Sequence, residues 1–304
     1  MAQLGVDYAN TDTIEKPGVA GFTRAKSAGA RIIIPRGVFG RPTNGQSPVF
    51  LDSYWARDKE DIVAAGLVRS SYLFVCVPTK ASPNPPPPAV QVAAFYGYVQ
   101  LAKPELGKRP QDMVPFFDVE MDSDVLSADA YYDWILEVAR GLRSAFGAWP
   151  GMYTSDRVWS EVLKDHAAGP LINCPLWIAK PWPWPVGSPV RLDGAPGYAP
   201  TTIPQFGDTT NWMIYQYAGD AIGMPGFAPG ATDTNRVNIV KRGAKGAIVR
   251  WIQARAGSIA IDGDFGPKTE ARIKQLQAAY ALASDGIVGA DTFTLLSWLT
   301  PAPL

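Results

Sequence analysis

The chain has little of the chemistry that metal-dependent and thiol-dependent enzymes use. Its 304 residues include two cysteines, Cys76 and Cys174, and one histidine, His166. Zinc sites take most of their ligands from these residue types, so the composition excludes an ordinary zinc amidase. No catalytic signature flanks either cysteine, which disfavours a Cys–His nucleophile pair. We therefore predict no metal and no cofactor. Two separate buried thiols are the simpler interpretation of the cysteines, although a bridge between them stays open.

The chain also lacks an excess of charge of either sign and any long apolar run. Lys+Arg and Asp+Glu are balanced at 28 each, whereas nucleic-acid and anionic-membrane binders carry an excess of positive charge. The N-terminus has no basic and apolar regions of a signal peptide, and no stretch approaches the roughly 20 apolar residues of a membrane helix. We expect a monomer that binds no nucleic acid, inserts into no membrane and suits a neutral polymer such as a glycan.

Apolar, β-branched and aromatic runs alternate with segments of helical periodicity before residue 240. Strands are predicted at 4–9, 31–36, 71–77, 114–121, 151–154, 175–179 and 212–217, and helices at 54–65, 90–102 and 128–146. Such alternation is typical of a mostly parallel sheet. With this number of strands it predicts an α/β fold, a modified (β/α) barrel that forms a catalytic domain over residues 1–240.

The pattern of the sequence changes after Asn238, and a short repeat follows. Residues 262–269 read Asp-Gly-Asp-Phe-Gly-Pro-Lys-Thr, and residues 285–292 read Asp-Gly-Ile-Val-Gly-Ala-Asp-Thr. Each Asp-Gly suits a tight turn, and each second glycine suits a sharp entry into a helix. The pattern predicts a small helical domain over residues 241–304, and we expect residues 1–240 to fold without it.

Acidic residues at predicted strand ends are the candidates for catalysis. Asp118 and Glu120 share one face of a strand, where close carboxyls raise one another's pKa. Glycoside hydrolysis needs a protonated acid beside a second carboxylate. Asp7 ends the first strand, Asp233 follows the last, and strand ends converge at one face of a barrel. The alternative is that these acids are solvated, or that Asp7 and Asp233 cap turns or helices.

An ordered set of short motifs resembles the family 25 glycoside hydrolases, the N-acetylmuramidase lysozymes. The set is Gly5-Val6-Asp7, Asp118-Val119-Glu120, Gly151-Met152-Tyr153-Thr154, Leu176-Trp177-Ile178-Ala179, Tyr215-Gln216-Tyr217 and Thr232-Asp233-Thr234-Asn235. The resemblance implies a modified barrel that cuts the β-1,4 bond between N-acetylmuramic acid and N-acetylglucosamine. It implies Glu120 as the general acid, with Asp118, Asp7 and Asp233 as supporting carboxylates.

The sequence departs from the family pattern at three places. Tyr215 stands where a tryptophan is usual, Leu73 stands where a histidine is usual, and Pro35-Arg36-Gly37 replaces an Ala-Thr-Glu type sequence. These departures leave the acids intact and bear on substrate preference.

Aromatic and amide side chains are the candidates for binding sugars. The motifs supply Tyr153, Trp177, Tyr215, Gln216 and Tyr217. Two more candidates, Trp182 and Trp184, lie in a segment rich in proline, where flat indole rings can stack on sugar faces. The alternative for Trp177, which we favour, is packing into the barrel wall.

The repeat at 262–292 resembles the peptidoglycan-binding domain of type 1, a three-helix module. A catalytic barrel followed by this module predicts a peptidoglycan hydrolase similar to a phage endolysin. It would be made in the host cytoplasm and act on the wall after release, or be exported by a non-classical route. We expect net retention of configuration, with Asp7 and Asp233 keeping the pKa of Glu120 raised.

Three other functions stay open at this point. An inactive wall-binding or virion structural protein is disfavoured because all four acids are present. A chitinase-like barrel enzyme is disfavoured because residues 114–116 carry no acids upstream of Asp118. An enzyme that cuts peptide bonds is disfavoured by the scarcity of cysteine and histidine.

Overall fold

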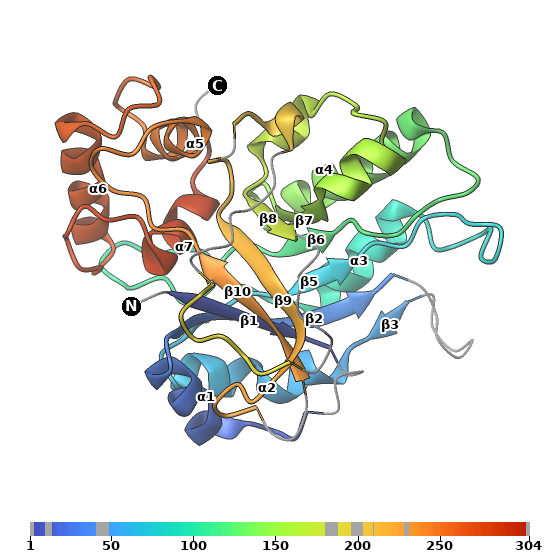
Figure 1. Ribbon diagram of the computed structural model, residues 1–304, viewed down its shortest axis with the longest axis horizontal. Helices are drawn as coiled ribbons and strands as arrows, with labels where there is room; N and C mark the ends of the chain where they lie inside the picture. The colour runs from blue at the N-terminus through green and yellow to red at the C-terminus, as the bar shows by residue number, and fades with distance from the viewer. Residues whose placement is uncertain are drawn as a thin grey trace.

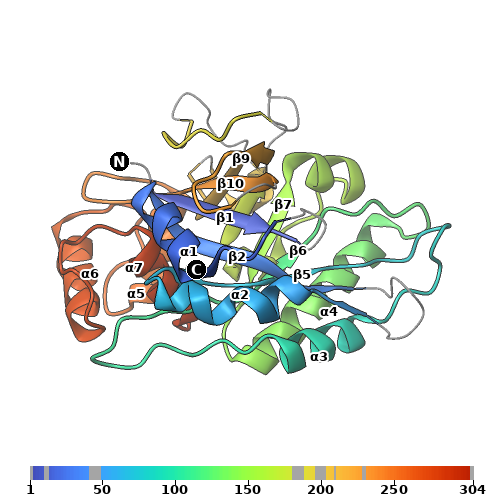
Figure 2. The same ribbon diagram turned by 90° about the horizontal axis from the view of Figure 1, so that it is seen from below.

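The computed structural model describes residues 3–9, 14–40, 49–179, 188–195, 203–208, 210–227 and 231–301. Within this part of the chain, eight strands close into a barrel in the order β1-β10-β9-β8-β7-β6-β5-β2, with β2 pairing again with β1 (Figures 1 and 2). The predicted α/β barrel is confirmed. The strands are β1 (Leu4–Tyr8), β2 (Ala30–Phe39), β5 (Tyr72–Phe74), β6 (Phe116–Asp118), β7 (Gly151–Ser155), β8 (Leu176–Ala179), β9 (Ile214–Ile222) and β10 (Ala231–Val237).

The eight strands of the barrel are parallel except at β10, which runs antiparallel to both β9 and β1. Seven of the strands correspond to the predicted ones, whereas β10 is the one that the sequence pattern does not predict. Two short strands lie outside the ring. The strand β3 (Phe50–Leu51) pairs antiparallel with β2, and β4 (Val68–Arg69) pairs parallel with it.

Four α-helices of the described chain pack around the barrel. They are α1 (Gly18–Ser27), α2 (Ser53–Ala64), α3 (Pro88–Tyr98) and α4 (Ala128–Phe146). The helix α4 has the predicted bounds because both of its ends carry local signals. The Ser127 hydroxyl accepts the N–H of Ala130 at 3.2 Å, and Gly147 ends the helix at φ +76°. The sequence pattern does not predict α1, since its apolar residues are few and Pro17 offers no side-chain cap. Later connections contain short helical turns, namely η1 (Val158–Val162), η2 (Gly169–Asn173) and η3 (Pro204–Phe206).

Aromatic side chains fill the barrel interior beneath one of its ends. The buried Trp177 ring meets the rings of Tyr72, Phe116 and Tyr153 edge-on, with centroids 6.1, 5.4 and 4.8 Å away. Gly151 makes room for this layer, because a Cβ atom there would lie 2.2 Å from the Phe116 ring. This aromatic layer forms a closed floor inside the barrel, and polar side chains of the neighbouring strands lie above it.

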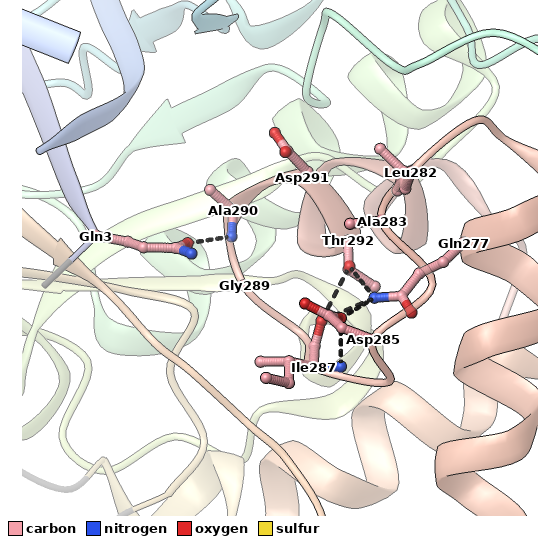
Figure 3. A pocket seen from close by; sticks show the side chains of 10 residues that line it. All are labelled: Gln3, Gln277, Leu282, Ala283, Asp285, Ile287, Gly289, Ala290, Asp291 and Thr292. Atoms are coloured by element: carbon pink, nitrogen blue, oxygen red, sulfur yellow. Dashed lines mark hydrogen bonds between the residues drawn. The ribbon is translucent and has the colours of Figure 1, made fainter. Parts of the chain in front are cut away.

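Three helices follow the barrel, as the repeat predicts: α5 (Ala247–Ala256), α6 (Pro267–Ala279) and α7 (Ala290–Trp298). The two copies of the repeat are built alike. In the second copy, the Gln277 amide donates to Asp285 Oδ1, to the carbonyl of Ile287 and to Thr292 Oγ1 at 2.9–3.1 Å (Figure 3).

In the first copy of the repeat, Gln253 donates to Asp262, Asp264 and Thr269 in the same way. The buried amide therefore ties each Asp-Gly turn to the following helix.

The helical module is packed against the barrel rather than tethered to it. Its contacts include residues that precede strands β1, β6, β8 and β9. Gln3 Oε1 accepts the N–H of Ala290 at 2.7 Å (Figure 3), and the indole of Trp298 donates to the carbonyl of Asp112 at 2.7 Å. Apolar residues of α5 and α7 belong to the same buried cluster as Phe116. The module therefore lies at the end of the barrel where the parallel strands begin (Figure 1).

Two further expectations can be compared with the described chain. Cys76 and Cys174 are both buried and are not joined by a disulfide, which confirms the interpretation as separate thiols. No helix of the described residues is long and apolar enough to cross a membrane.

Candidate active site

A pocket opens at the opposite end of the barrel, where the parallel strands end. Its volume is about 170 Å³, and acidic and aromatic side chains from the barrel strands and their flanks line it. The lining residues are Asp7, Tyr8, Ala9, Arg36, Tyr72, Phe74, Asp118, Glu120, Tyr153, Trp177 and Asp233. All four acids predicted from the sequence therefore meet in one pocket. Within the described residues, no group of three or more Asp, Glu, His or Cys side chains is arranged to hold a metal ion.

Asp118 is the last residue of β6 and is almost wholly buried, with 5% of its surface exposed. The N–H of Val75 binds its carbonyl at 3.1 Å, so the backbone is fixed by the neighbouring strand. Its carboxyl Oδ1 has no hydrogen-bond partner among the described residues. Burial raises the pKa of Asp118 well above its usual range, and the charges of Glu120, Asp7 and Asp233 add to the rise while Arg36 opposes it.

Glu120 follows two residues later and is more open to solvent. The intervening Val119 is held on both sides, because its N–H binds the carbonyl of Tyr153 at 2.9 Å and its carbonyl accepts the Thr154 hydroxyl at 3.0 Å. Desolvation raises the pKa of Glu120, and Arg157 opposes that rise. Asp118 and Glu120 therefore form a pair that keeps a proton at a pH where separate carboxyls would be ionised.

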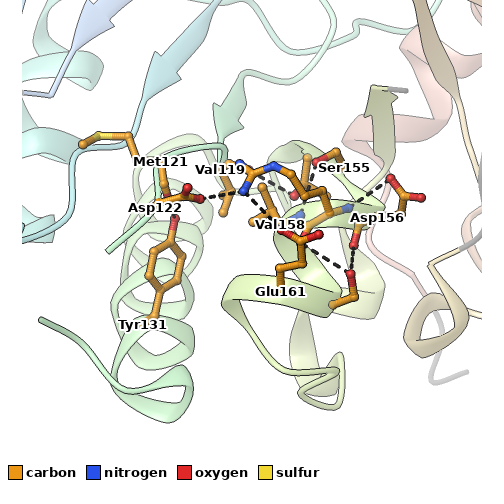
Figure 4. Close-up of polar contacts among 11 residues, drawn as sticks. Val119, Met121, Asp122, Tyr131, Ser155, Asp156, Val158 and Glu161 are labelled. Carbon is orange, nitrogen blue, oxygen red and sulfur yellow. Dashed lines mark hydrogen bonds and ion pairs between the residues drawn. The ribbon is translucent and has the colours of Figure 1, made fainter. Parts of the chain in front are cut away.

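Arg157, just after β7, is the cation that acts on Glu120. Its side chain is 42% exposed, and it binds Asp122 at 2.9 Å and lies 3.9 Å from Glu161 (Figure 4). These two carboxylates and the surrounding water weaken its field at Glu120.

Asp7 and Asp233 face each other across the antiparallel pair of β1 and β10. Asp7 Oδ1 accepts the side-chain amide of Asn235 at 2.7 Å. Asp233 accepts the amide of Gln216 at 2.7 Å and the backbone N–H of Asp220 at 2.7 Å. Asp7 and Asp233 raise the pKa of Asp118, the carboxyl buried beside them. The raised pKa of Glu120 comes mainly from desolvation, and the expected contribution of Asp7 and Asp233 to it stays a prediction.

The predicted sugar-binding residues are divided between the two faces of the barrel wall. Tyr153 and Trp177 line the pocket, and the indole N–H of Trp177 donates to Asn235 at 2.7 Å. Gln216 lies behind the residues that line the pocket. Its side-chain oxygen accepts the Tyr153 hydroxyl at 2.6 Å, and its side-chain NH2 group donates to Asp233. Trp177 is thus both packed into the barrel and part of the pocket wall.

Tyr215 and Tyr217 lie on the other face of β9, because neighbouring residues of a strand point to opposite sides. They pack with Leu4, Ala195 and Ala221 in a separate apolar cluster, and neither lines the pocket. Trp182 and Trp184 lie outside the described residues, so their predicted stacking role stays a prediction.

The sequence-based assignment omits Asn235 and five residues of the lining, namely Tyr8, Ala9, Arg36, Tyr72 and Phe74. Two of these six, Asn235 and Arg36, bear directly on the acids of the site. Asn235 connects Asp7 to Trp177, and Arg36 places a cation among the acids. Both stand in segments that the family motifs span. The signal for Arg36 is its charge at the end of an apolar strand, where an isolated cation is costly.

The arrangement provides the elements of glycoside hydrolysis. Two carboxyls with raised pKa lie above an aromatic floor, one at the end of β6 and one two residues beyond it, and two further carboxylates are held by amides. One carboxyl of such a pair can donate a proton to a leaving oxygen while the other stabilises positive charge on the sugar ring.

Comparisons with known proteins agree with this chemistry. A family model described as "Glycosyl hydrolases family 25" matches residues 12–224, and one described as "Putative peptidoglycan binding domain" matches residues 246–296. Asp7 and Asp233 lie outside both ranges, so their place in the site depends on the fold. The zinc D-Ala-D-Ala carboxypeptidase of Streptomyces albus G is 43% identical over 61 residues, which are 18% of this chain and 24% of that protein. The match therefore spans about a quarter of that relative.

Solved structures with the same fold include a lysozyme and a muramidase. A bacterial lysozyme from Streptomyces coelicolor is 19% identical with a TM-score of 0.57, and the alignment covers 78% of this chain and 93% of that one. A muramidase from Acremonium alcalophilum is 20% identical with a TM-score of 0.54, again covering 78% and 93% of the two chains. At these identities the likeness is one of fold.

Proposed function

The chain belongs to the glycosyl hydrolases of family 25, and we propose that it cuts the β-1,4 bond between N-acetylmuramic acid and N-acetylglucosamine. Peptidoglycan hydrolase activity agrees with the family and with the wall-binding module that follows the barrel. The observation that carries the finer proposal is the pair of neighbouring carboxyls, Asp118 and Glu120, in one pocket. The pocket is a recess with an aromatic floor, which suits a sugar ring above an apolar surface.

We assign the general-acid role to Glu120. It is the more open of the two carboxyls and its pKa is raised, so it can hold a proton and still reach the glycosidic oxygen. Asp118 lies deeper, two residues earlier, at the end of β6. In extended backbone, Cα atoms two residues apart are about 6.5–7 Å from each other. That spacing favours the short carboxyl separation of retaining enzymes.

The substrate itself offers a nucleophile. The 2-acetamido group of the sugar can attack the anomeric carbon, while ionised Asp118 orients it and stabilises the resulting cation. Glu120 first protonates the leaving oxygen and then deprotonates the attacking water, which restores its proton. Two displacements at the same carbon give net retention. Direct attack by Asp118 gives the same stereochemistry.

We propose a domain boundary after Val240, with a catalytic domain over residues 1–240 and a wall-binding domain over 241–304. The second domain would raise the concentration of the enzyme at an insoluble wall. We further propose that the protein acts as a monomer without nucleic acid, and that it reaches the wall by release from a lysing host or by non-classical export. Sedimentation of the purified protein and fractionation of producing cells would test these two points.

The experiment that tests the function identifies the new sugar end. Purified peptidoglycan is digested, the fragments are reduced with borohydride, and the reduced sugars are identified by mass spectrometry. Reduced muramic acid supports the proposal. Reduced glucosamine would indicate a glucosaminidase, and new amines without reducing ends would indicate a peptidase or amidase.

The stereochemistry is tested by NMR on the first product formed from a soluble wall fragment. A β-anomer is expected, since the cut bond is β and retention is proposed. An initial α-anomer would refute the retaining mechanism while leaving the assignment of substrate intact.

A further inference from the structure

Arg36 is the cationic side chain among the described residues that line the acidic pocket. It stands near the end of β2, where it pairs in register with Tyr72 of β5. On the other side of β5, Phe74 pairs with Asp118 of β6. One strand therefore separates the backbone of Arg36 from that of Asp118, and the Arg36 side chain is only 11% exposed.

A buried carboxylate holds Arg36 in place from outside the pocket. Arg36 Nε donates to Asp52 Oδ2 at 3.0 Å, and the Asp52 side chain is fully buried. Asp52 is itself fixed, because its Oδ1 caps α2 by accepting the N–H of Tyr54 at 2.9 Å and its own N–H binds the carbonyl of Gly37 at 2.9 Å. Asp52 does not line the pocket. The pair is thus oriented with its positive end toward the acids.

The proposed reaction needs an unequal pair of carboxyls, with a proton on Glu120 and a charge on Asp118. Burial alone works against this distribution, because Asp118 is the deeper of the two and a buried charge is costly. A fixed cation of low exposure lowers that cost for the carboxyl that it faces. Arg157, beside Glu120, is 42% exposed and held by Asp122, so water and its partner screen it.

We propose that Arg36 is a positioning residue that keeps the negative charge on Asp118, so that the proton shared by the pair resides on Glu120. The inference rests on the proposed function. The charged groups that act on Asp118 are Glu120, Asp7, Asp233 and Arg36, and of these Arg36 is the one that lowers its pKa. Removing the cation should therefore raise the pKa of Asp118 and leave it protonated over a wider range of pH.

The first test measures Asp118 directly and needs no substrate. The protein is labelled with ¹³C at the aspartate carboxyls, and the Asp118 signal is assigned by its loss in Asp118→Asn. Arg36→Gln should move its titration midpoint up by about one pH unit or more, since an opposite charge close to a carboxyl changes its pKa by about 1–3. Arg36→Lys should restore most of the difference.

Two further variants separate the effect of the Arg36 charge from a loss of folding. Arg36→Gln leaves Asp52 buried without its cation and can destabilise the fold, so Arg36→Gln with Asp52→Asn removes both charges and keeps a residue that can cap α2. Arg57→Gln is the matched control, because Arg57 also binds a buried carboxylate, Asp58, at 2.6 Å but does not line the pocket. The double variant should raise the Asp118 midpoint, and the control should not.

The second test is the pH profile of kcat/KM on soluble wall fragments. Asp118 must be ionised, so its pKa sets the acidic limb, and this limb should move to higher pH in Arg36→Gln by the same amount. Activity at the low-pH edge should fall about tenfold for each pH unit by which the limb moves. The proposal would be overturned if the Asp118 midpoint were unchanged both in Arg36→Gln and in the double variant. It would also be overturned if Arg36→Lys raised the midpoint as much as Arg36→Gln does. If the wild-type protein produced no reduced muramic acid, the proposed function would fail while the NMR titration still decided the role of Arg36.

Discussion

Trp298 is the residue through which we expect the helical module to stabilise the barrel. It is the last residue of α7, is 7% exposed, and donates its indole N–H to the carbonyl of Asp112 at 2.7 Å. Asp112 is in turn held by two hydrogen bonds from Arg69, at 2.8 and 2.9 Å. Trp298 thus connects α7 to the segment that precedes β6, the strand that ends in Asp118.

Trp298→Ala should lower the stability of the whole protein. Replacing a buried tryptophan with alanine costs about 3–5 kcal/mol, since the apolar contact is lost and a cavity remains. In a chain of this size about 1 kcal/mol corresponds to about 2–4 °C, so Tm should fall by roughly 6–20 °C. Differential scanning calorimetry measures this directly. Ile287→Ala, at a residue of the same module that is 36% exposed, is the control and should change Tm little.

The number of transitions decides the physical interpretation. If the barrel and the module share one core, they should melt in a single transition that moves as a whole in Trp298→Ala. Two separate transitions, with only the smaller one displaced, would refute this reasoning. Truncation after Val240 should likewise yield a barrel of lower stability, in contrast to the independent folding that the sequence pattern suggests.

Three further predictions concern the carboxyl pair. Glu120→Gln should lose about 100- to 10,000-fold or more in hydrolysis of purified walls, because the amide cannot donate the acid's proton. Its Tm should not fall, since the raised pKa of Glu120 means that removing this carboxyl does not destabilise the fold; near-normal activity would remove Glu120 from its role. Arg157→Gln should move the alkaline limb of the kcat/KM profile to higher pH, since Arg157 lowers the pKa of a group that acts when protonated; the limb should move by less than about one pH unit because the cation is largely solvated. Asp118→Asn should be inactive yet more stable at neutral pH. Its raised native pKa means that ionisation destabilises the fold above that pKa, so the Tm difference from wild type should shrink as pH falls and Asp118 becomes protonated; a lower Tm at neutral pH would contradict this.

The barrel and the meeting of its acids could be predicted because local patterns and topology act together. Alternating strands and helices indicate parallel strands, and parallel strands bring their ends to one face. This is enough to gather Asp7, Asp118 and Glu120 in one pocket. This meeting of the acids does not depend on the details of packing, so a pattern of residue types is enough to predict it.

The sequence pattern does not predict the strand β10, because the face of β10 that points into the barrel is polar. Asp233 and Asn235 belong to a run that resembles a turn, and their place in a strand depends on partners from β1 and β9. The register shifts twice along β10 against β9, which further disturbs the alternation. Hydrogen bonds from residues far away in the sequence make such a strand stable, and a local pattern does not contain them.

The roles of Arg36, Tyr215 and Tyr217 lie beyond the sequence for a related reason. A motif aligns residues without saying which face of the strand they occupy. In Tyr215-Gln216-Tyr217 the middle residue faces the site and its neighbours face an apolar cluster. Arg36 departs from a family pattern, but its effect depends on burial and on Asp52, which only the fold reveals.

The place of the module bears on how wall binding and cutting are combined. Gln3, which binds the start of α7, and Asp7, in the pocket, are four residues apart along β1 and its flank, or about 13 Å. The module therefore lies at the end of the barrel opposite the pocket. Val240 and Val288 exchange two backbone hydrogen bonds, of 2.9 and 2.8 Å, so the connection between the two parts is itself held. A flexible tether would allow the module to bind the same glycan strand that the active site cuts, close to the cut bond. We therefore expect a module fixed at the far end to set the separation between the wall surface that it binds and the glycan strand in the pocket. The geometry of the wall, rather than the length of a linker, should then determine which bonds the enzyme reaches.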